Sequence, residues 1–225
     1  MRLDGRRTAD DTGEVDSVLA ISACGPRLEV ALRHEPGATV SLIALAGPAP
    51  RSDVIIAAVD LLLRSAGLAP GQLDAVVATR GPGSFTGVRV ALATAQGIAR
   101  GAGIPAHGFS SLLAQATRTS AGQVLAVQPA RRGEVYAQLF TRRGGFPEAA
   151  GEILVMAVSA LADSEVPVIA PSGLTLPAGV PMAPSGMSAA EALLTLVEGL
   201  AGCDEATLVP TYVEPPPALP LVREV

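Results

Sequence analysis

The chain has 225 residues, of which 49% are hydrophobic and 16% charged, and its formal net charge is −5 at pH 7. This length and hydropathy predict a compact soluble protein with one large core or two small ones. The acidic balance argues against a protein that holds RNA or DNA on its own basic surface. All 16 basic residues are arginine, which excludes a P-loop NTPase and any Schiff-base lysine.

The beginning of the chain is polar and includes Asp and Glu where a secretory signal would carry an apolar run. Residues 1–17 are therefore expected to be a disordered extension. The longest apolar run, Val54 to Leu63, is interrupted by Asp60 and falls short of the roughly 20 residues that span a bilayer. Cys24 and Cys203 lack the spacing of a metal site, so we expect neither zinc nor a disulfide, and a reducing cytoplasmic location.

Residues 18–109 are predicted to form a first subdomain with the element order β-β-β-α-β-α-β. Short apolar segments separated by turn formers indicate an antiparallel meander of three strands between Val18 and Leu45. Two helices with glycine stops are predicted at Asp53–Ala66 and Thr86–Arg100. Further strands are expected at Leu73–Thr79 and Pro105–Phe109.

Residues 110–208 are predicted to form a smaller second subdomain, which begins with a helix capped by Ser110. The remaining pattern indicates a short helix near Ser159, a helix from Ser188 to about Leu200, and strands at Gln123–Val127, Glu134–Phe140, Ile153–Met156 and Val166–Ala170. The tail, residues 209–225, contains three consecutive prolines and is expected to be extended.

A glycine-rich segment joins the buried strand at Leu73–Thr79 to the second helix. We call it the signature loop, and it consists of Gly81, Pro82, Gly83, Ser84, Phe85, Thr86 and Gly87. Helix N-terminal amides at such a turn can hold an anion. The segment nevertheless fits neither GxxxxGK[ST] nor GxGxxG. We favour a tight turn capped by Ser84 or Thr86, with a nucleotide site as the alternative.

Both predicted helices of the first subdomain are apolar in almost every direction. A sheet can cover only one side of each helix, so the outer sides pack under another layer or form a subunit interface. Few residues remain to supply a third layer, and we therefore expect a partner interface. Its predicted residues are Val54, Ile55, Ala58, Leu62, Thr86, Arg89, Val90, Ala91, Thr94, Ala95 and Ile98.

The residue pattern indicates neither a catalytic group nor a metal ligand set. His34 and His107 are the only histidines, and the HExxH pattern is absent. Ser84 and Ser110 have no His/Asp relay that sequence can identify. Two pairs of arginines, Arg131-Arg132 and Arg142-Arg143, are interpreted as charges exposed to solvent at hairpin turns rather than as an RNA-binding patch.

The run RGPGSFTGVRVALATAQGIARGAGIPAHGFSSL, which begins at Arg80, closely resembles the bacterial TsaB (YeaZ) family. VLAISACGPRLEVAL from Val18 and RRGEVY from Arg131 extend the resemblance, which covers roughly Val18 to Phe140 and is faint beyond. It implies an α/β fold of the actin-like, Hsp70-like (ASKHA) ATPase type. Such a fold has two ribonuclease-H-like subdomains, and the second is expected to be reduced.

The resemblance also implies a function. Family members are non-catalytic subunits that pair through their first two helices with TsaD, the catalytic, metal-holding paralogue, and the ATPase TsaE assists. The complex installs a threonylcarbamoyl group on N6 of adenosine 37 in tRNAs reading codons that begin with A. The chain is expected to form a homodimer when alone, to contact tRNA only indirectly and to need no cofactor, although the complex uses ATP. The alternative is a stand-alone ATP-binding enzyme of the actin-like superfamily, formerly labelled a glycoprotease.

Two positions depart from the family pattern. The family usually has an Asp after the first strand, where this chain has Ser22, and Asp-Ala-Arg before the GEVY segment, where this chain has Pro129. In actin-like folds the carboxylate after the first strand helps to place a metal. Ser22 has no negative charge with which to do so. The loss of both acids weakens a catalytic interpretation and leaves the expected partner surface untouched.

Overall fold

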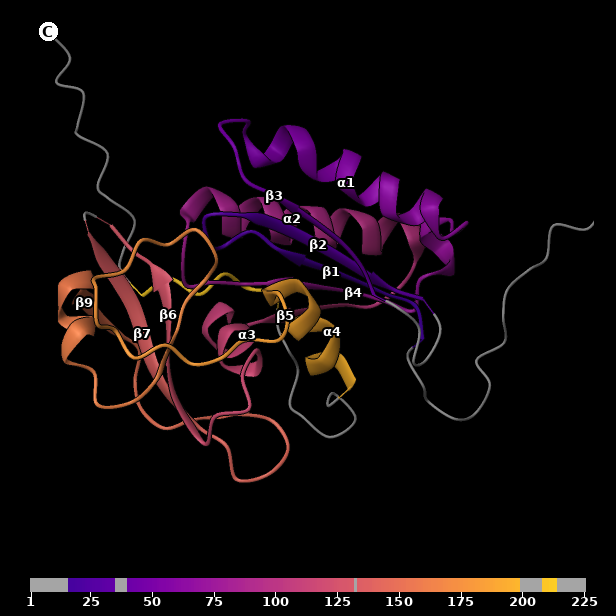
Figure 1. The fold of residues 1–225 in the computed structure, drawn as a ribbon. Coiled ribbons are helices and arrows are strands. Elements are labelled where there is room, and N and C mark those ends of the chain that lie inside the picture. Colours follow the sequence, from indigo (N-terminus) through magenta and orange to yellow (C-terminus); the bar gives the residue numbers. More distant parts are fainter. Residues whose placement is uncertain (1–15, 35–39, 132, 199–207, 214–225) are drawn as a thin grey trace, which may run out of the picture.

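The computed structural model describes residues 16–34, 40–131, 133–198 and 208–213. Figure 1 shows two sheets, the first with helices on both faces. The strand order of the first sheet is β3-β2-β1-β4-β5. It is formed by β1 (Val18–Ser22), β2 (Leu28–Arg33), β3 (Ser41–Leu45), β4 (Ala75–Thr79) and β5 (Ala106–Phe109). β1, β2 and β3 pair antiparallel, which confirms the predicted meander, and β4 joins β1 in parallel.

The central strands are apolar at nearly every position and buried along their whole length. Because successive side chains point to opposite faces, both faces of this sheet are buried. Leu19 and Ile21 of β1 belong to one core, together with residues of α1 (Arg51–Ser65) and α2 (Phe85–Ala102). Val18 and Ala20 face the opposite core, with α3 (Ser111–Thr117) and α4 (Ala189–Glu198). Figure 1 shows these two pairs of helices on opposite sides of the sheet. The predicted helices Asp53–Ala66 and Thr86–Arg100 are confirmed as α1 and α2.

The second sheet is smaller and has the order β10-β6-β7-β8, with β9 also paired to β7. Its strands are β6 (Gln123–Pro129), β7 (Glu134–Thr141), β8 (Glu148–Ala149), β9 (Leu154–Ala157) and β10 (Val168–Ile169). Short 3-10 helices occur at Pro70–Gln72 (η1) and Val158–Asp163 (η2). α3 connects the two sheets, because Ala114 packs with the first and Leu112 and Ala116 with the second.

α4 packs on the first sheet, although we placed its residues in the second subdomain. Leu193 and Val197 join the core that contains Val18. The buried carboxylate of Glu29 on β2 accepts hydrogen bonds from the backbone nitrogens of Ala189 at 2.9 Å and Ala190 at 3.3 Å. The helix N-terminus is thus capped from the first sheet, so the chain returns to its first subdomain after completing the second.

The predicted N-terminal extension and most of the predicted tail lie outside the described residues. Residues 208–213 of the tail are described and contain neither helix nor strand. The subdomain boundary at residue 110 stays a prediction. In the ranges that the structure describes, no helix has the length and apolar character needed to cross a membrane.

Candidate functional site

The signature loop packs tightly against the loop that follows β1. A Cβ added at Gly87 would lie 1.9 Å from the carbonyl oxygen of Ala23, and one at Gly83 would lie 2.6 Å from that of Cys24. The Ser84 backbone nitrogen donates to the Cys24 carbonyl oxygen at 2.9 Å. The Ser84 hydroxyl oxygen accepts a hydrogen bond from the Gly87 nitrogen at 3.2 Å and caps α2. The predicted turn with a Ser84 cap is therefore confirmed.

The described part of the tail crosses the signature loop. The Thr211 backbone nitrogen donates to the Arg80 carbonyl oxygen at 2.7 Å. The rings of Tyr212 and Phe85 lie 5.7 Å apart between centroids. Arg89 donates from Nε to the Tyr212 hydroxyl at 3.2 Å, and its guanidinium carbon lies 3.8 Å from the Phe85 ring centroid. Arg89, predicted as an interface residue, thus contacts the tail of its own chain.

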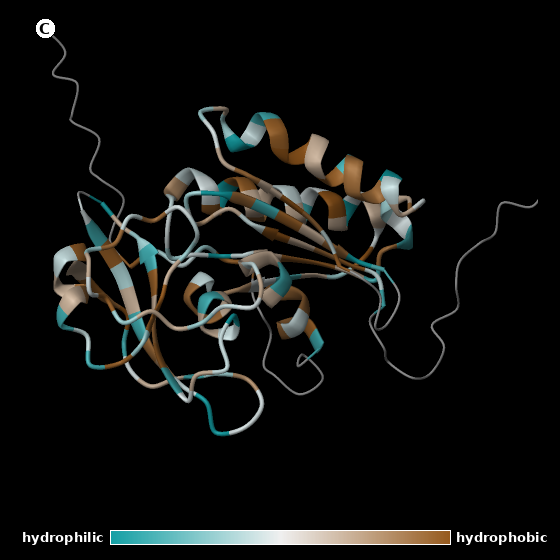
Figure 2. Ribbon diagram, in the orientation of Figure 1, coloured by the Kyte–Doolittle hydropathy of each residue, from teal (hydrophilic) through white to brown (hydrophobic). Residues whose placement is uncertain are grey.

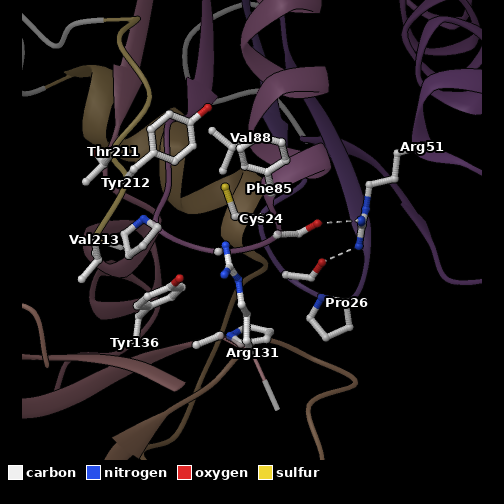
Figure 3. Close-up of a pocket in the computed structure, with 16 residues that line it drawn as sticks. Cys24, Pro26, Arg51, Phe85, Val88, Arg131, Tyr136, Thr211, Tyr212 and Val213 are labelled. Carbon is white, nitrogen blue, oxygen red and sulfur yellow. Dashed lines mark hydrogen bonds between the residues drawn. The ribbon is translucent and has the colours of Figure 1, made fainter. Parts of the chain in front are cut away.

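A cavity of about 420 Å³ lies beside the signature loop, between the two sheets. Five segments form its walls (Figure 3), namely the loop after β1, the start of α1, the signature loop with the start of α2, the β6–β7 hairpin and the tail. The lining residues are Cys24, Gly25, Pro26, Arg51, Pro82, Gly83, Ser84, Phe85, Val88, Pro129, Ala130, Arg131, Tyr136, Thr211, Tyr212 and Val213. Among the described residues of the lining, the charged groups are Arg51 and Arg131, and none is a carboxylate.

The two arginines reach the cavity from different subdomains. Arg51, at the start of α1, donates to the Gly25 carbonyl oxygen, and its Nη1 lies 3.5 Å from the Ser84 hydroxyl. Arg131, in the turn between β6 and β7, extends toward the middle of the cavity in Figure 3. The cavity therefore has cationic side chains from both subdomains.

Cys24 lies in the cavity wall, but its chemistry is that of a core residue. The side chain is fully buried, and desolvation raises the pKa of its thiol from 9.0 to about 11. The thiol donates to the Thr79 hydroxyl at 3.1 Å. Because the thiolate is the reactive form, Cys24 is not a nucleophile at neutral pH. Cys203 lies outside the described residues.

The two positions that depart from the family pattern lie at or near the cavity. Pro129 lines it, and Ser22 is buried at the end of β1. Neither histidine lines it; His34 Nδ1 lies 2.8 Å from the Ser17 hydroxyl, and burial lowers the pKa of His107. Among the described residues no group of three or more His, Cys, Asp or Glu side chains could hold a metal ion.

The predicted interface residues differ in their exposure. Five of them are buried in this chain's own core between the helices and the first sheet, namely Ile55, Ala58, Leu62, Ala91 and Ala95. Side chains in these positions cannot offer direct contacts to a partner while the chain stays folded. Val54, Val90, Thr94 and Ile98 are half-buried, and Thr86 and Arg89 are exposed. That these helices form an interface stays a prediction.

α1 instead exposes two large apolar residues that we did not select from the sequence. Ile56 is 58% exposed and Leu61 is 61% exposed. Figure 2 shows hydrophobic residues along α1. The helical period identifies these two positions once the core stripe of α1 is known, because Ile56 lies about a quarter of a turn and Leu61 about a third of a turn from its centre, on opposite flanks. The exposed apolar residues of α1, Ile56 and Leu61, therefore differ from the residues of this helix that were predicted for the interface.

The fold and the cavity together define an α/β protein of the actin-like, ribonuclease-H-like ATPase type, with a reduced second subdomain. The solved structure of YeaZ from Pseudomonas aeruginosa superposes with a TM-score of 0.71 at 26% identity, covering 88% of this chain and 100% of that chain. The profile of the family described as "TsaD: tRNA N6-adenosine threonylcarbamoyltransferase" matches residues 51–189.

Curated relatives narrow the assignment. An uncharacterized protein of Mycobacterium tuberculosis (strain H37Rv) is 33% identical over 222 residues, covering 92% of this chain and 96% of its own length. The "tRNA threonylcarbamoyladenosine biosynthesis protein TsaB" of Escherichia coli is 37% identical over 123 residues, covering 53% and 52%. The chain belongs to the TsaB (YeaZ) family. The chain spans only part of several relatives. Its alignment covers 52% of the length of the Escherichia coli protein, 36% of another protein named TsaB and 20% of a further curated relative.

Proposed function

We propose that this chain is a non-catalytic subunit of a complex that threonylcarbamoylates N6 of adenosine 37 in tRNAs reading codons that begin with A. Its partner in this proposal is the catalytic paralogue TsaD, with TsaE as the assisting ATPase, and it forms a homodimer when alone. It acts in the cytoplasm and contacts tRNA only through its partner. Support comes from family membership and from relatives named as tRNA threonylcarbamoyladenosine biosynthesis proteins.

The exposed apolar side of α1 is the observation that carries the proposal. Ile56 and Leu61 are more than half exposed on a helix whose other side packs in the core. Burying a side chain of this size contributes roughly 1.5–3 kcal/mol. Contiguous apolar surface commonly marks a protein–protein contact, and these two side chains lie on the two flanks of the solvent side of α1. A partner helix that covers α1 would remove both side chains from water.

The cavity supports a non-catalytic role and gives little support to a stand-alone ATP-binding enzyme. The described residues of its lining include no carboxylate that could hold a magnesium–nucleotide complex. Amides of the signature loop and of the start of α2 already donate to Cys24 and Ser84. The Cys24 thiol is buried and protonated. In this proposal the chain needs no cofactor of its own, and ATP is consumed elsewhere in the complex.

Leu61→Glu tests the proposed surface. Mixed with purified TsaD, this variant should bind at least about tenfold more weakly in titration calorimetry, because an apolar contact is replaced by a charge that must be desolvated. Its thermal unfolding should match that of the original chain, since the site is exposed. In a reconstituted tRNA modification assay, activity should require this chain and should fall with Leu61→Glu.

Leu154→Glu is the matched control, because Leu154 is 60% exposed on β9 in the second sheet. This control should bind TsaD with unchanged affinity. If Ile56→Glu and Leu61→Glu both pair with TsaD as tightly as the control does, α1 is not the interface. If modification proceeds equally well without the chain, the proposed function itself is wrong.

A further inference from the structure

The cavity between the sheets contains two positive charges, and none of the described residues that line it carries a carboxylate. In the part of the chain that the structure describes, the ion pairs join other residues, and neither Arg51 nor Arg131 takes part in one. Arg51 donates hydrogen bonds to a carbonyl oxygen and a hydroxyl, which leave its positive charge in place. Cationic groups gathered in a partly enclosed space favour the entry of an anion.

The remaining walls suit the apolar part of a small molecule. Phe85 and Tyr212 contact one another on the side of α2, and Tyr136 lies on the side of the second sheet (Figure 3). Val88 and Val213 complete an apolar surface beside these rings. A volume of about 420 Å³ is in the range of small-molecule sites, which combine apolar walls with a few polar groups.

We propose that this cavity binds a small organic anion, namely a carboxylate or a phosphate monoester attached to a flat apolar group. The anionic group pairs with the guanidinium of Arg131, and the positive charge of Arg51 adds to the attraction. The apolar group packs against Tyr136 and Tyr212. This binding site goes beyond the proposed function and does not depend on it, because every group it uses belongs to the isolated chain.

Pro129 favours such an anion over a magnesium-bound nucleotide. This residue lines the cavity at the position where the family usually has an Asp. A carboxylate there would stand two residues before Arg131 and would compete with an incoming anion. Magnesium needs oxygen ligands, of which carboxylates are the usual protein source. The uncharged Pro129 therefore leaves a wall that attracts anions and, among its described residues, offers no carboxylate to magnesium.

Titration calorimetry on the full-length chain tests the proposal, with phenyl phosphate and benzoate as probes and inorganic phosphate and magnesium–ATP as comparisons. One organic anion or both should bind saturably without magnesium and more tightly than inorganic phosphate. Arg131→Gln should weaken this binding about tenfold or more, because charge-assisted hydrogen bonds are lost. Arg143→Gln removes an exposed arginine outside the cavity and should leave binding unchanged.

A second variant, Pro129→Asp, should weaken binding by placing a negative charge in the wall. Three results would each overturn the proposal. The first is no saturation by either organic anion up to about 10 mM, and the second is binding that Arg131→Gln leaves unchanged. The third is magnesium–ATP binding more tightly than both probes. None of these results alters the TsaD affinity of Leu61→Glu, which reports on a different surface.

Discussion

At the scale of single residues, Gly87 is fixed by a neighbour's backbone, whereas Gly97 on the same helix is free of such contact. A Cβ at Gly87 would lie 1.9 Å from the Ala23 carbonyl oxygen and 2.9 Å from its carbonyl carbon. At Gly97 an added Cβ meets nothing within 4 Å. Only a shift of α2 away from β1 can relieve the first contact, since a carbonyl group within a packed loop cannot rotate aside.

These two glycines give a matched pair of substitutions. Gly87→Ala should destabilise the chain by roughly 2–4 kcal/mol, because packed backbone must move. Gly97→Ala should stabilise it by about 0.5–1 kcal/mol, because alanine loses less conformational entropy in a helix. Urea unfolding followed by circular dichroism measures both. Equal stability of the two variants would show that the contact with Ala23 does not determine how α2 is placed.

The sequence predicted part of this loop and not the rest. A Ser beside glycines at a strand-to-helix junction indicates a capped turn, and Ser84 does cap α2. The carbonyl groups that lie against Gly83 and Gly87 belong to an earlier loop of the chain, and no local pattern identifies such a contact. The tail presents the same difficulty, because Thr211 contacts Arg80 through a hydrogen bond between backbone atoms.

At the scale of elements, α4 depends on a carboxylate from the opposite end of the chain. Glu29 is buried, and its Oε2 accepts from two amides at the helix N-terminus. A carboxylate there also interacts favourably with the helix dipole. Beside it, Arg118 donates to the Met187 and Ala170 carbonyl oxygens at 2.9 and 2.8 Å. Burial lowers the pKa of Arg118, and the charge of Glu29 opposes that shift.

Glu29→Ala should therefore destabilise the chain by about 1–3 kcal/mol, since two buried amides lose their acceptor and Arg118 loses a neighbouring charge. Amide hydrogen exchange should rise first in residues 189–198. The surface variant Glu152→Ala serves as the control and should change stability by less than about 0.5 kcal/mol. Exchange in α4 that matches the control would contradict the capping role assigned to Glu29.

Periodicity was sufficient for α1, α2 and the longer strands of both sheets, because each buries a regular stripe or alternates between two faces. The two-residue strand β8 (Glu148–Ala149) was not predicted, since it is too short to show a period. It was insufficient for the position of α4. Ala189–Glu198 has the pattern of a helix with a buried side, but that pattern does not state which sheet covers it. Order along the chain suggested the second sheet, and the packing of Leu193 with β1 overrides that expectation.

At the scale of the whole molecule, the cavity exists because five separate segments meet between the sheets. The family resemblance predicted the two subdomains, and the departure at Pro129 pointed to a position that does line the cavity. The contribution of Thr211, Tyr212 and Val213 could not be predicted, since the pattern of the tail indicates only extended backbone. The exposed side of α1 likewise became visible only when its core side had been located.

The overall charge leads to a last prediction, that the isolated chain does not retain tRNA. The chain has 21 acidic and 16 basic residues. Of the predicted hairpin pair, Arg142 donates to the Thr119 carbonyl oxygen at 2.9 Å and to that of Gly145, so it is engaged within its own chain. Affinity for nucleic acid depends on cationic side chains that displace the counterions of the phosphates. Basic proteins bind nucleic acid non-specifically with dissociation constants of roughly 10⁻⁴–10⁻⁶ M.

In filter binding with unmodified tRNA at about 50 mM salt, the isolated chain should show no saturation up to about 100 µM. Its dissociation constant would then lie above the non-specific range of basic proteins. Adding TsaD should bring the chain onto tRNA, and adding Leu61→Glu together with TsaD should not. Micromolar binding by the chain alone, falling steeply as salt rises and weakened by Arg143→Ala, would mean that it contacts RNA directly. Its role would then include holding the substrate, because a subunit with its own RNA affinity raises the local concentration of tRNA at the catalytic partner.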